Sequence, residues 1–212
     1  MTDSSEHTTK ASTADRILDA ADELFGQHGY DGVSIRDVAD RADVNKASVF
    51  YHYKSKDELF ERVLERYYSA HHRALEQAFQ QDGTLRSRVH HVIDAYIDFI
   101  LQNRRFPGLV QTIVNSSQDH LPFIQRSMGM LLAWTEVALG DVTPATGPLS
   151  ARQFYVTIAG AVIHYFVYAP VLEPVWGEDP MLPEGVTERR EHLHWLIDTA
   201  LNGLRAEGIV VD

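Results

Sequence analysis

The stretch NKASVFYHYKSK, residues 45–56, decides how the rest of this chain is read, because it predicts a short helix with one apolar and one polar side. Asn45 is a good N-cap, since its side-chain oxygen can accept from a backbone N–H two or three residues further on. Val49 and Tyr53 are four residues apart and are expected to face a core. A helix of about eight residues spans only about 12 Å and does not persist alone in water, so a larger domain must hold it.

The other side of this predicted helix is polar. It carries Lys46, Ser48, Tyr51 and His52. One cation, one hydroxyl and two planar polar rings suit the edge of a nucleic-acid groove. This side is therefore the first candidate for a functional surface.

The preceding residues predict the support for that helix. Ser34 and Asp37 have the spacing of a capping box, in which each side chain accepts from the other residue's backbone N–H. They predict a helix from Ile35 to about Ala42, followed by a turn at residues 43–44. Two short helices joined by such a turn describe a helix-turn-helix. The side chains expected to face the core are Ile35, Val38 and Ala39.

At these residues the chain resembles the DNA-binding domain of TetR-family (tetracycline-repressor-like) transcriptional regulators, over roughly Ser12 to Leu64. The resemblance implies an all-α protein of about nine helices. It would have an N-terminal three-helix helix-turn-helix domain and a C-terminal helical ligand-sensing and dimerisation domain. The stretches that carry the resemblance are Ile17–Ala21, Leu24–Phe25, Gly29–Tyr30, Ser34–Ala39 and the stretch that ends in Lys56–Leu59.

The resemblance also implies which side chains face DNA. We expect Lys46 and Tyr51 to read base edges and Ala47 to let the backbone approach the duplex. Phosphates would be held by Ser34, Ser48, His52 and Lys56. The full candidate set is Ser34, Arg36, Lys46, Ala47, Ser48, Phe50, Tyr51, His52 and Lys56.

Two positions depart from the family pattern. Asp43 stands in the turn where glycine is usual, and Asp tolerates a left-handed backbone less well than glycine but better than most residues. Phe50 stands where a phosphate-contacting tyrosine is usual. One hydroxyl-to-phosphate bond is therefore missing, and Ser48, His52 or Lys56 must contribute more.

Composition fits an ordinary globular protein, with 212 residues, 44% hydrophobic and 23% charged. The chain has no cysteine, which excludes disulfides and cysteine-ligated metals and is compatible with the cytosol. Met1–Lys10 is polar and lacks the apolar core of a signal peptide. The most apolar stretch, Ile158–Val175, is interrupted by His164, two prolines and Glu173, so we expect a soluble, cytoplasmic protein.

The charge distribution favours local rather than general binding of nucleic acid. The net charge is −11, and Met1–Phe60 holds seven Lys and Arg against twelve Asp and Glu. Ser34–Lys56 reverses this balance, with five basic and three acidic residues. Beyond a Debye length of about 10 Å distant acids are screened, so a basic footprint is needed only at the contact. We expect weak non-specific binding that falls further as salt rises.

The predicted domains are a disordered arm at residues 1–11, the helix-turn-helix domain at 12–56 and the effector-binding and dimerisation domain at 57–212. Ser12 and Asp15 predict the start of the first helix, and Ser55 and Glu58 the start of a long one. Helices are expected at about 56–81, 85–103, 107–115, 119–139, 150–169 and 186–206. Four of the eight prolines fall between Pro170 and Pro183, which predicts a long ordered loop or flap.

Aromatic and methionine residues of the second domain are candidates to line a cavity for an apolar or aromatic effector. For any one of them a filled helical core is the simpler interpretation, and the cavity itself is implied by the resemblance. The sequence does not identify the ligand. The candidates are Phe99, Phe106, Met128, Trp134, Tyr155, His164 and Tyr168.

The last two predicted helices are candidates for a dimer interface. A helix-turn-helix usually binds DNA as a two-fold pair, since two half-sites about 34 Å apart multiply a modest single-module affinity. The resemblance implies a four-helix interface, although the same residues could pack inside one subunit. They are Phe154, Ile158, Val162, Leu193, Ile197 and Leu201.

Metal and enzyme sites are not indicated. The pairs His71-His72, His90-His91 and His192/His194 have spacings that do not put two imidazoles on one helix face. No glycine-rich phosphate loop, nucleophile elbow or HExxH motif occurs, so no cofactor or catalytic residue is predicted.

Taken together, the residues and the resemblance predict a homodimeric, ligand-responsive regulator that binds a palindromic double-stranded DNA operator, most often as a repressor. The alternative is a helical protein-interaction or small-molecule-binding module without specific DNA binding, which Asp43, Phe50 and the net negative charge of Met1–Phe60 favour. The sequence does not identify the operator, the target genes, the effector, the sign of regulation or the number of dimers per operator.

Overall fold

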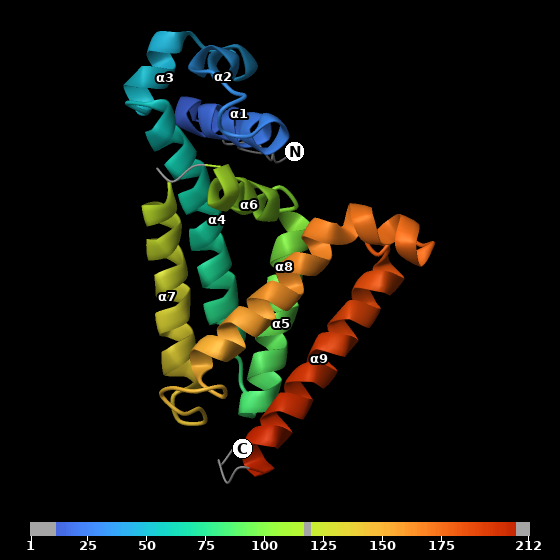
Figure 1. The fold of residues 1–212 in the computed structure, drawn as a ribbon. Helices are drawn as coiled ribbons and strands as arrows, with labels where there is room; N and C mark the ends of the chain where they lie inside the picture. The colour runs from blue at the N-terminus through green and yellow to red at the C-terminus, as the bar shows by residue number, and fades with distance from the viewer. Residues whose placement is uncertain (1–11, 117–119, 207–212) are drawn as a thin grey trace, which may run out of the picture. The chain divides into compact units, whose positions relative to one another are not determined.

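The computed structural model of the chain describes residues 12–116 and 120–206, and within these ranges it contains nine α-helices and no strand (Figure 1). The predicted all-α fold class is confirmed. The helices are α1 (Thr13–His28), α2 (Ile35–Arg41), α3 (Lys46–His52), α4 (Lys56–Phe79), α5 (Leu85–Gln102), α6 (Phe106–Ser116), α7 (Leu121–Leu139), α8 (Ala151–Trp176) and α9 (Pro183–Ala206).

The chain divides into two compact units, Met1–Arg66 and Tyr67–Asp212, and the division falls inside α4. The predicted arm at residues 1–11 lies outside the described residues. The predicted roles of the two domains stay predictions at this point.

The N-terminal unit begins its helices where the sequence predicts. Ser12 with Asp15 at α1, and Ser34 with Asp37 at α2, form reciprocal capping boxes. At α3 the side chain of Asn45 accepts from the backbone N–H of Ser48 at 2.8 Å. These caps satisfy backbone donors that have no partner within their helices.

The start of α4 differs from the prediction in one hydrogen bond. The hydroxyl of Ser55 accepts from the backbone N–H of Glu58 at 3.0 Å, as expected. The carboxylate of Glu58 does not complete the capping box at Ser55. It accepts instead from the backbone N–H of Lys54, the residue before Ser55, at 2.9 Å.

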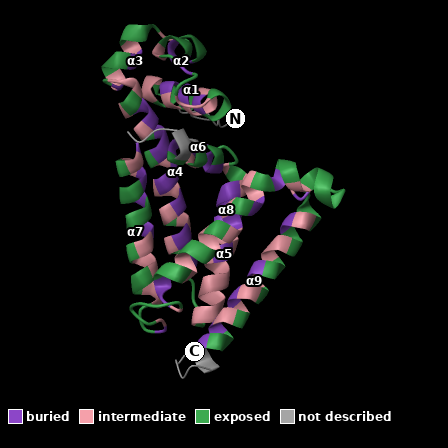
Figure 2. Ribbon diagram, in the orientation of Figure 1, coloured by how far each residue is buried: buried purple, intermediate pink, exposed green. Residues whose placement is uncertain are grey.

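The core of the N-terminal unit holds α3 in place. Each of α1, α2 and α3 carries buried residues (Figure 2). Val38 and Val49 are fully buried, whereas Ile35, also predicted to be buried, is only half-buried. Tyr53, at the end of α3, is buried, and its hydroxyl donates to the Ala14 carbonyl of α1 at 3.1 Å. The short helix therefore gains from tertiary packing the stability that its length cannot supply.

The C-terminal unit is built from packed helix pairs. α5 packs against α9, α7 packs against α8, and α8 also contacts α5 and α6. The end of α4 joins this packing through aromatic contacts. The ring of Tyr68 meets that of Phe106 on α6 edge to face at 5.1 Å, and Phe79 meets Trp134 on α7 at 5.5 Å.

The predicted proline-rich loop or flap over residues 170–183 is wrong for most of its length. α8 continues through Pro170 and Pro174 to Trp176, and Gly177 closes it with a left-handed conformation of φ 79°. Each proline removes one helical hydrogen bond, which bends a helix rather than always ending it. Both prolines are exposed, so water can reach the carbonyls left without a donor, and Figure 1 shows α8 bending toward its C-terminal end.

Candidate DNA-contacting surface and effector cavity

The turn before α3 tolerates the aspartate that departs from the family pattern. Asp43 has a φ of 53°, within the left-handed region, and it is the one non-glycine residue with positive φ among those described. The backbone N–H of Val44 still donates to the Ala39 carbonyl at 3.0 Å. Asp43 therefore does not disrupt the geometry that joins α2 to α3.

The outer face of α3 presents the side chains predicted to meet bases. Tyr51 is 85% exposed, and Lys46 and Ala47 are also exposed. The Lys46 ammonium lies 5.6 Å from the centroid of the exposed Phe50 ring. Phe50 thus supports a cation at the surface even though it lacks a hydroxyl for a phosphate.

Three of the residues predicted to contact phosphates differ in whether their polar groups are already hydrogen-bonded or partly buried. The Ser48 hydroxyl donates to Asn45 Oδ1 at 3.1 Å, so it is partly committed to the cap of α3. The Ser34 hydroxyl accepts from the Asp37 N–H at 3.2 Å, which leaves its own proton for a phosphate oxygen. His52 is half-buried, and its ring meets that of Tyr51 edge to face at 5.1 Å.

The two predicted cations outside α3 are positioned differently. Lys56 lies in the first turn of α4, and its ammonium is 4.1 Å from the centroid of the Tyr30 ring. Arg36, on α2, pairs with Asp40 at 3.8 Å, and both side chains are largely exposed. Such a pair contributes little to stability, so the Arg36 guanidinium remains available to exchange Asp40 for a phosphate.

A cavity of about 660 Å³ lies in the C-terminal unit, lined by residues of α4 to α9. Six of the seven predicted cavity residues line it: Phe106, Met128, Trp134, Tyr155, His164 and Tyr168. The exception, Phe99, does not line it and instead packs between His71 and Phe106, with ring centroids 4.8 and 5.6 Å away.

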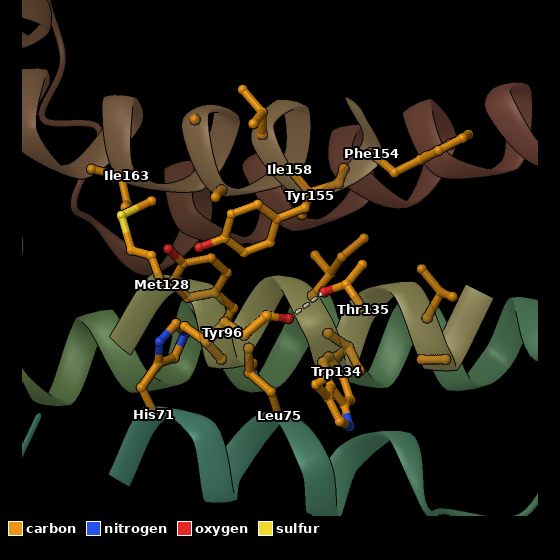
Figure 3. Close-up of a pocket in the computed structure, with 18 of the residues that line it drawn as sticks. His71, Leu75, Tyr96, Met128, Trp134, Thr135, Phe154, Tyr155, Ile158 and Ile163 are labelled. Atoms are coloured by element: carbon orange, nitrogen blue, oxygen red, sulfur yellow. Dashed lines mark hydrogen bonds between the residues drawn. The ribbon is translucent and has the colours of Figure 1, made fainter. Parts of the chain in front are cut away.

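One end of the cavity gathers polar rings (Figure 3). His71 from α4, Tyr96 from α5 and Tyr155 from α8 line it. Burial lowers the pKa of His71 to about 4, with His72 adding to the effect, so the ring is neutral near pH 7. Burial raises the pKa of Tyr96 and of Tyr155, so both keep their hydroxyl protons.

Sequence reasoning missed His71 and Tyr96, as well as Tyr68, which also lines the cavity. A signal for His71 was present, because it lies three residues after Tyr68 and four before Leu75, on the buried stripe of α4. A histidine at such a position is either a satisfied core residue or part of a site.

The residues predicted for a dimer interface lie inside the single chain. Val162, Leu193, Ile197 and Leu201 are at most 3% exposed. Phe154 and Ile158 are half-buried and line the cavity. The exposed apolar side chains of α8 and α9 are different ones, among them Val171, Val175 and Trp195.

Histidines of α5 and α9 form hydrogen bonds with carboxylates of the facing helix. His90 lies 2.9 Å from Asp198, and His194 lies 2.8 Å from Asp94, each across the two helices. The two imidazole rings stack at 4.1 Å. In residues 12–116 and 120–206 no group of three His, Asp or Glu side chains is arranged to hold a metal ion.

Comparison with known proteins points to one family at the N-terminus. The sequence model described as "Bacterial regulatory proteins, tetR family" matches residues 17–63. The HTH-type transcriptional regulator YttP of Bacillus subtilis, whose name is qualified as probable, is 41% identical over 75 residues, which cover 35% of this chain and 36% of that protein. The biofilm operon negative regulator IcaR of Staphylococcus epidermidis is 39% identical over 51 residues, or 24% of this chain and 28% of that protein.

These sequence matches span 36% and 28% of the relatives' length, whereas the similarity in fold extends over most of the chain. The fatty acid degradation regulator FadR of Bacillus halodurans has a TM-score of 0.69 at 13% identity, covering 89% of this chain and 96% of that one. At such low identity the likeness is one of fold. Each of these proteins is named as a regulator.

Proposed function

We propose that this chain, whose residues 17–63 match the sequence model of the tetR family of bacterial regulatory proteins, is a ligand-responsive transcriptional regulator that binds a palindromic operator as a homodimer. The observation that most supports this proposal is the burial pattern of α3. Lys46, Ala47 and Tyr51 are exposed, whereas Val49 is fully buried. A helix held by its apolar side and presenting polar groups outward is what major-groove readout requires.

We propose a division of roles among the residues of the footprint. Lys46 and Tyr51 read base edges, and Ala47 lets the helix approach the groove closely. Ser34 and Lys56 hold phosphates. The contact surface is completed by Arg36, Ser48, Phe50 and His52. Ser48 contributes little to DNA binding, because its hydroxyl already donates to Asn45 Oδ1.

Dimerisation is proposed through the exposed faces of α8 and α9. α8 is long and apolar enough to cross a membrane by composition alone, yet only 17% of its most apolar window is buried in one chain. Large apolar surfaces of this kind are usually covered by a partner. Gly160 on α8 and Gly203 on α9 have open space where a Cβ would stand, which would let a second helix approach closely.

The cavity is proposed to bind a small apolar or aromatic effector that releases the dimer from DNA, in the cytoplasm. α4 is one continuous helix that carries Lys56 at its start and the cavity residues Tyr68, His71 and Leu75 further along. A ligand that prefers one tilt of α4 would change the separation of the two α3 helices. The ligand must bind one arrangement of the dimer more tightly than the other, since a ligand that binds both equally does not shift the equilibrium between them.

Genomic enrichment tests this function. Purified chain is mixed with sheared bacterial genomic DNA of the source strain, and the bound fragments are sequenced. We expect a limited set of fragments that share a palindromic motif. A Lys46→Ala/Tyr51→Ala double variant, folded as judged by circular dichroism, should lose that set. If the double variant binds the same set of fragments as the parent chain, the result would favour the alternative, a protein-interaction module without specific DNA binding.

A further inference from the structure

The effector cavity contains no charged side chain among the described residues that line it. Its polar groups are hydroxyls, one amide, two imidazoles and the indole N–H of Trp134, and the remaining side chains are apolar. A charged group buried in such surroundings loses its hydration and gains no partner. The interior therefore discriminates against carboxylates, phosphates and ammonium groups.

His71 presents hydrogen-bonding groups that the protein does not use. Its side chain is 4% exposed, and neither ring nitrogen has a hydrogen-bond partner among the described residues. The ring is held between Tyr96, at 4.4 Å, and Phe99, at 4.8 Å. A neutral imidazole offers one donor and one acceptor. Because buried polar groups are nearly always hydrogen-bonded, His71 indicates a partner from outside the chain.

Two tyrosine hydroxyls lie at the same end of the cavity. Figure 3 shows the hydroxyls of Tyr96 and Tyr155 next to each other on the side where His71 lies. Among the described residues, no hydrogen bond joins either hydroxyl to another residue. Burial keeps both phenols protonated, so each can donate a hydrogen bond. Donors thus converge here in a wall that is otherwise apolar.

We propose that this end of the cavity binds the carbonyl oxygen of an uncharged, otherwise apolar ligand, a ketone or an ester, with the hydroxyls of Tyr96 and Tyr155 donating to its two lone pairs and His71 beside them. A carbonyl oxygen has two lone pairs and brings no charge, so it matches converging donors without a nearby cation. The hydrocarbon part of the ligand lies along Leu75, Ile158 and Trp134. This assignment rests on the proposed role of the cavity as the effector site, and it names the ligand class.

The size of the cavity agrees with this class. About 660 Å³ is within the range of sites that enclose small organic ligands. Most pockets of this kind combine an apolar wall with a few converging polar groups that fix orientation. His71, Tyr96 and Tyr155 provide that orientation from three different helices, α4, α5 and α8.

The first test uses prodan, an uncharged naphthyl ketone whose emission moves to longer wavelength when its carbonyl accepts hydrogen bonds. Prodan should bind the full chain without DNA. Tyr96→Phe and Tyr155→Phe should each weaken binding about tenfold, the effect of one hydrogen bond, and move the bound emission to shorter wavelength. Unchanged affinity and emission in both variants would overturn the assignment.

Thr135→Val is the matched control. Thr135 lines the same cavity, but its hydroxyl already donates to the Leu131 carbonyl at 2.9 Å. Removing this hydroxyl should leave prodan affinity and emission unchanged. His71→Phe keeps an aromatic ring beside Phe99 and should also weaken binding. If that variant does not fold, the two tyrosine variants, checked by circular dichroism, still decide the question.

The second test concerns charge. Methyl decanoate and decanoate, which share one carbon chain, compete with prodan at about pH 8. The ester should displace prodan at a concentration at least about tenfold lower, since the carboxylate meets no cation. Equal competition would contradict the uncharged ligand class. Neither test uses DNA, so their failure leaves the proposed DNA binding standing, and a failure to bind DNA leaves their results valid.

Discussion

The ammonium nitrogen of Lys56 lies 4.1 Å from the ring centroid of Tyr30, and the Tyr30 hydroxyl donates to Asp57 Oδ1 at 2.5 Å. A tyrosine in the turn after α1 thus contacts both a cation and an anion of the first turn of α4. The cation–π contact orients Lys56 without neutralising it as a salt bridge would. Lys56 therefore remains a charged group at a helix N-terminus, where phosphate is favoured.

Lys56→Ala should weaken binding to selected and random DNA by a similar factor, because a phosphate contact carries no sequence information. The slope of log affinity against log salt should decrease by about one for each subunit. Binding is measured by fluorescence anisotropy over a range of salt. Arg62→Ala removes the same charge from a later turn of α4, where Arg62 pairs with Glu65, and should leave the slope unchanged. An unchanged slope for Lys56→Ala would exclude this residue from the footprint.

Asp43→Gly and Asp43→Ala should differ in stability. At a φ of 53° a residue with a Cβ is strained, and glycine is not. We expect the glycine variant to be at least as stable as the parent and about 1 kcal/mol more stable than the alanine variant. Urea unfolding followed by circular dichroism measures both. An alanine variant as stable as the glycine one would show that the turn does not require its left-handed residue.

His71 should make the protein less stable in acid. Its pKa is 6.5 when unfolded and about 4 when folded, so between these values the unfolded state binds the extra proton. The free energy of unfolding therefore falls as pH falls from about 6.5 to 4, by about 3 kcal/mol in total from this residue. His71→Phe should flatten that part of the pH profile in urea unfolding. His192→Gln, at an exposed position of α9, is the control and should follow the parent.

Trp195→Glu should dissociate the proposed dimer. Trp195 is 60% exposed in one chain, on the outer face of α9, and a large aromatic side chain of this kind is a common anchor of interfaces. We expect the dimer dissociation constant to rise by about 100-fold or more in sedimentation equilibrium. Val137→Glu, on α7, changes a residue that is 83% exposed and should have no effect. A dimer unaffected by Trp195→Glu would place the interface elsewhere.

Local signals were sufficient for the N-terminal unit. Caps at Ser12, Ser34 and Asn45 are decided within three residues, so the sequence predicts where α1, α2 and α3 begin. The end of α8 was not predictable in the same way. Prolines at positions 170 and 174 read as helix breakers, but the helix tolerates them where solvent can reach the freed carbonyls.

The cavity shows a different limit. Aromatic residues such as Trp134 and Tyr155 could be proposed for its wall from composition, but composition does not separate a cavity from a filled core. Phe99 illustrates this, because it was predicted to line the cavity but instead stacks against the His71 ring. The surroundings of His71 depend on contacts between two different helices. Its missing hydrogen-bond partners become visible only once α4 and α5 are packed together.

Selection from a random pool of double-stranded DNA, with purified full-length chain at moderate salt, tests the central claim most directly. A dimeric regulator should enrich a palindrome whose half-sites lie about one helical turn apart or a small multiple of that spacing, bound by an even number of chains. Scrambling one half-site should then reduce the affinity sharply. Failure to enrich any sequence, with the protein folded, dimeric and free of ligand, would contradict the account and favour a helical interaction module.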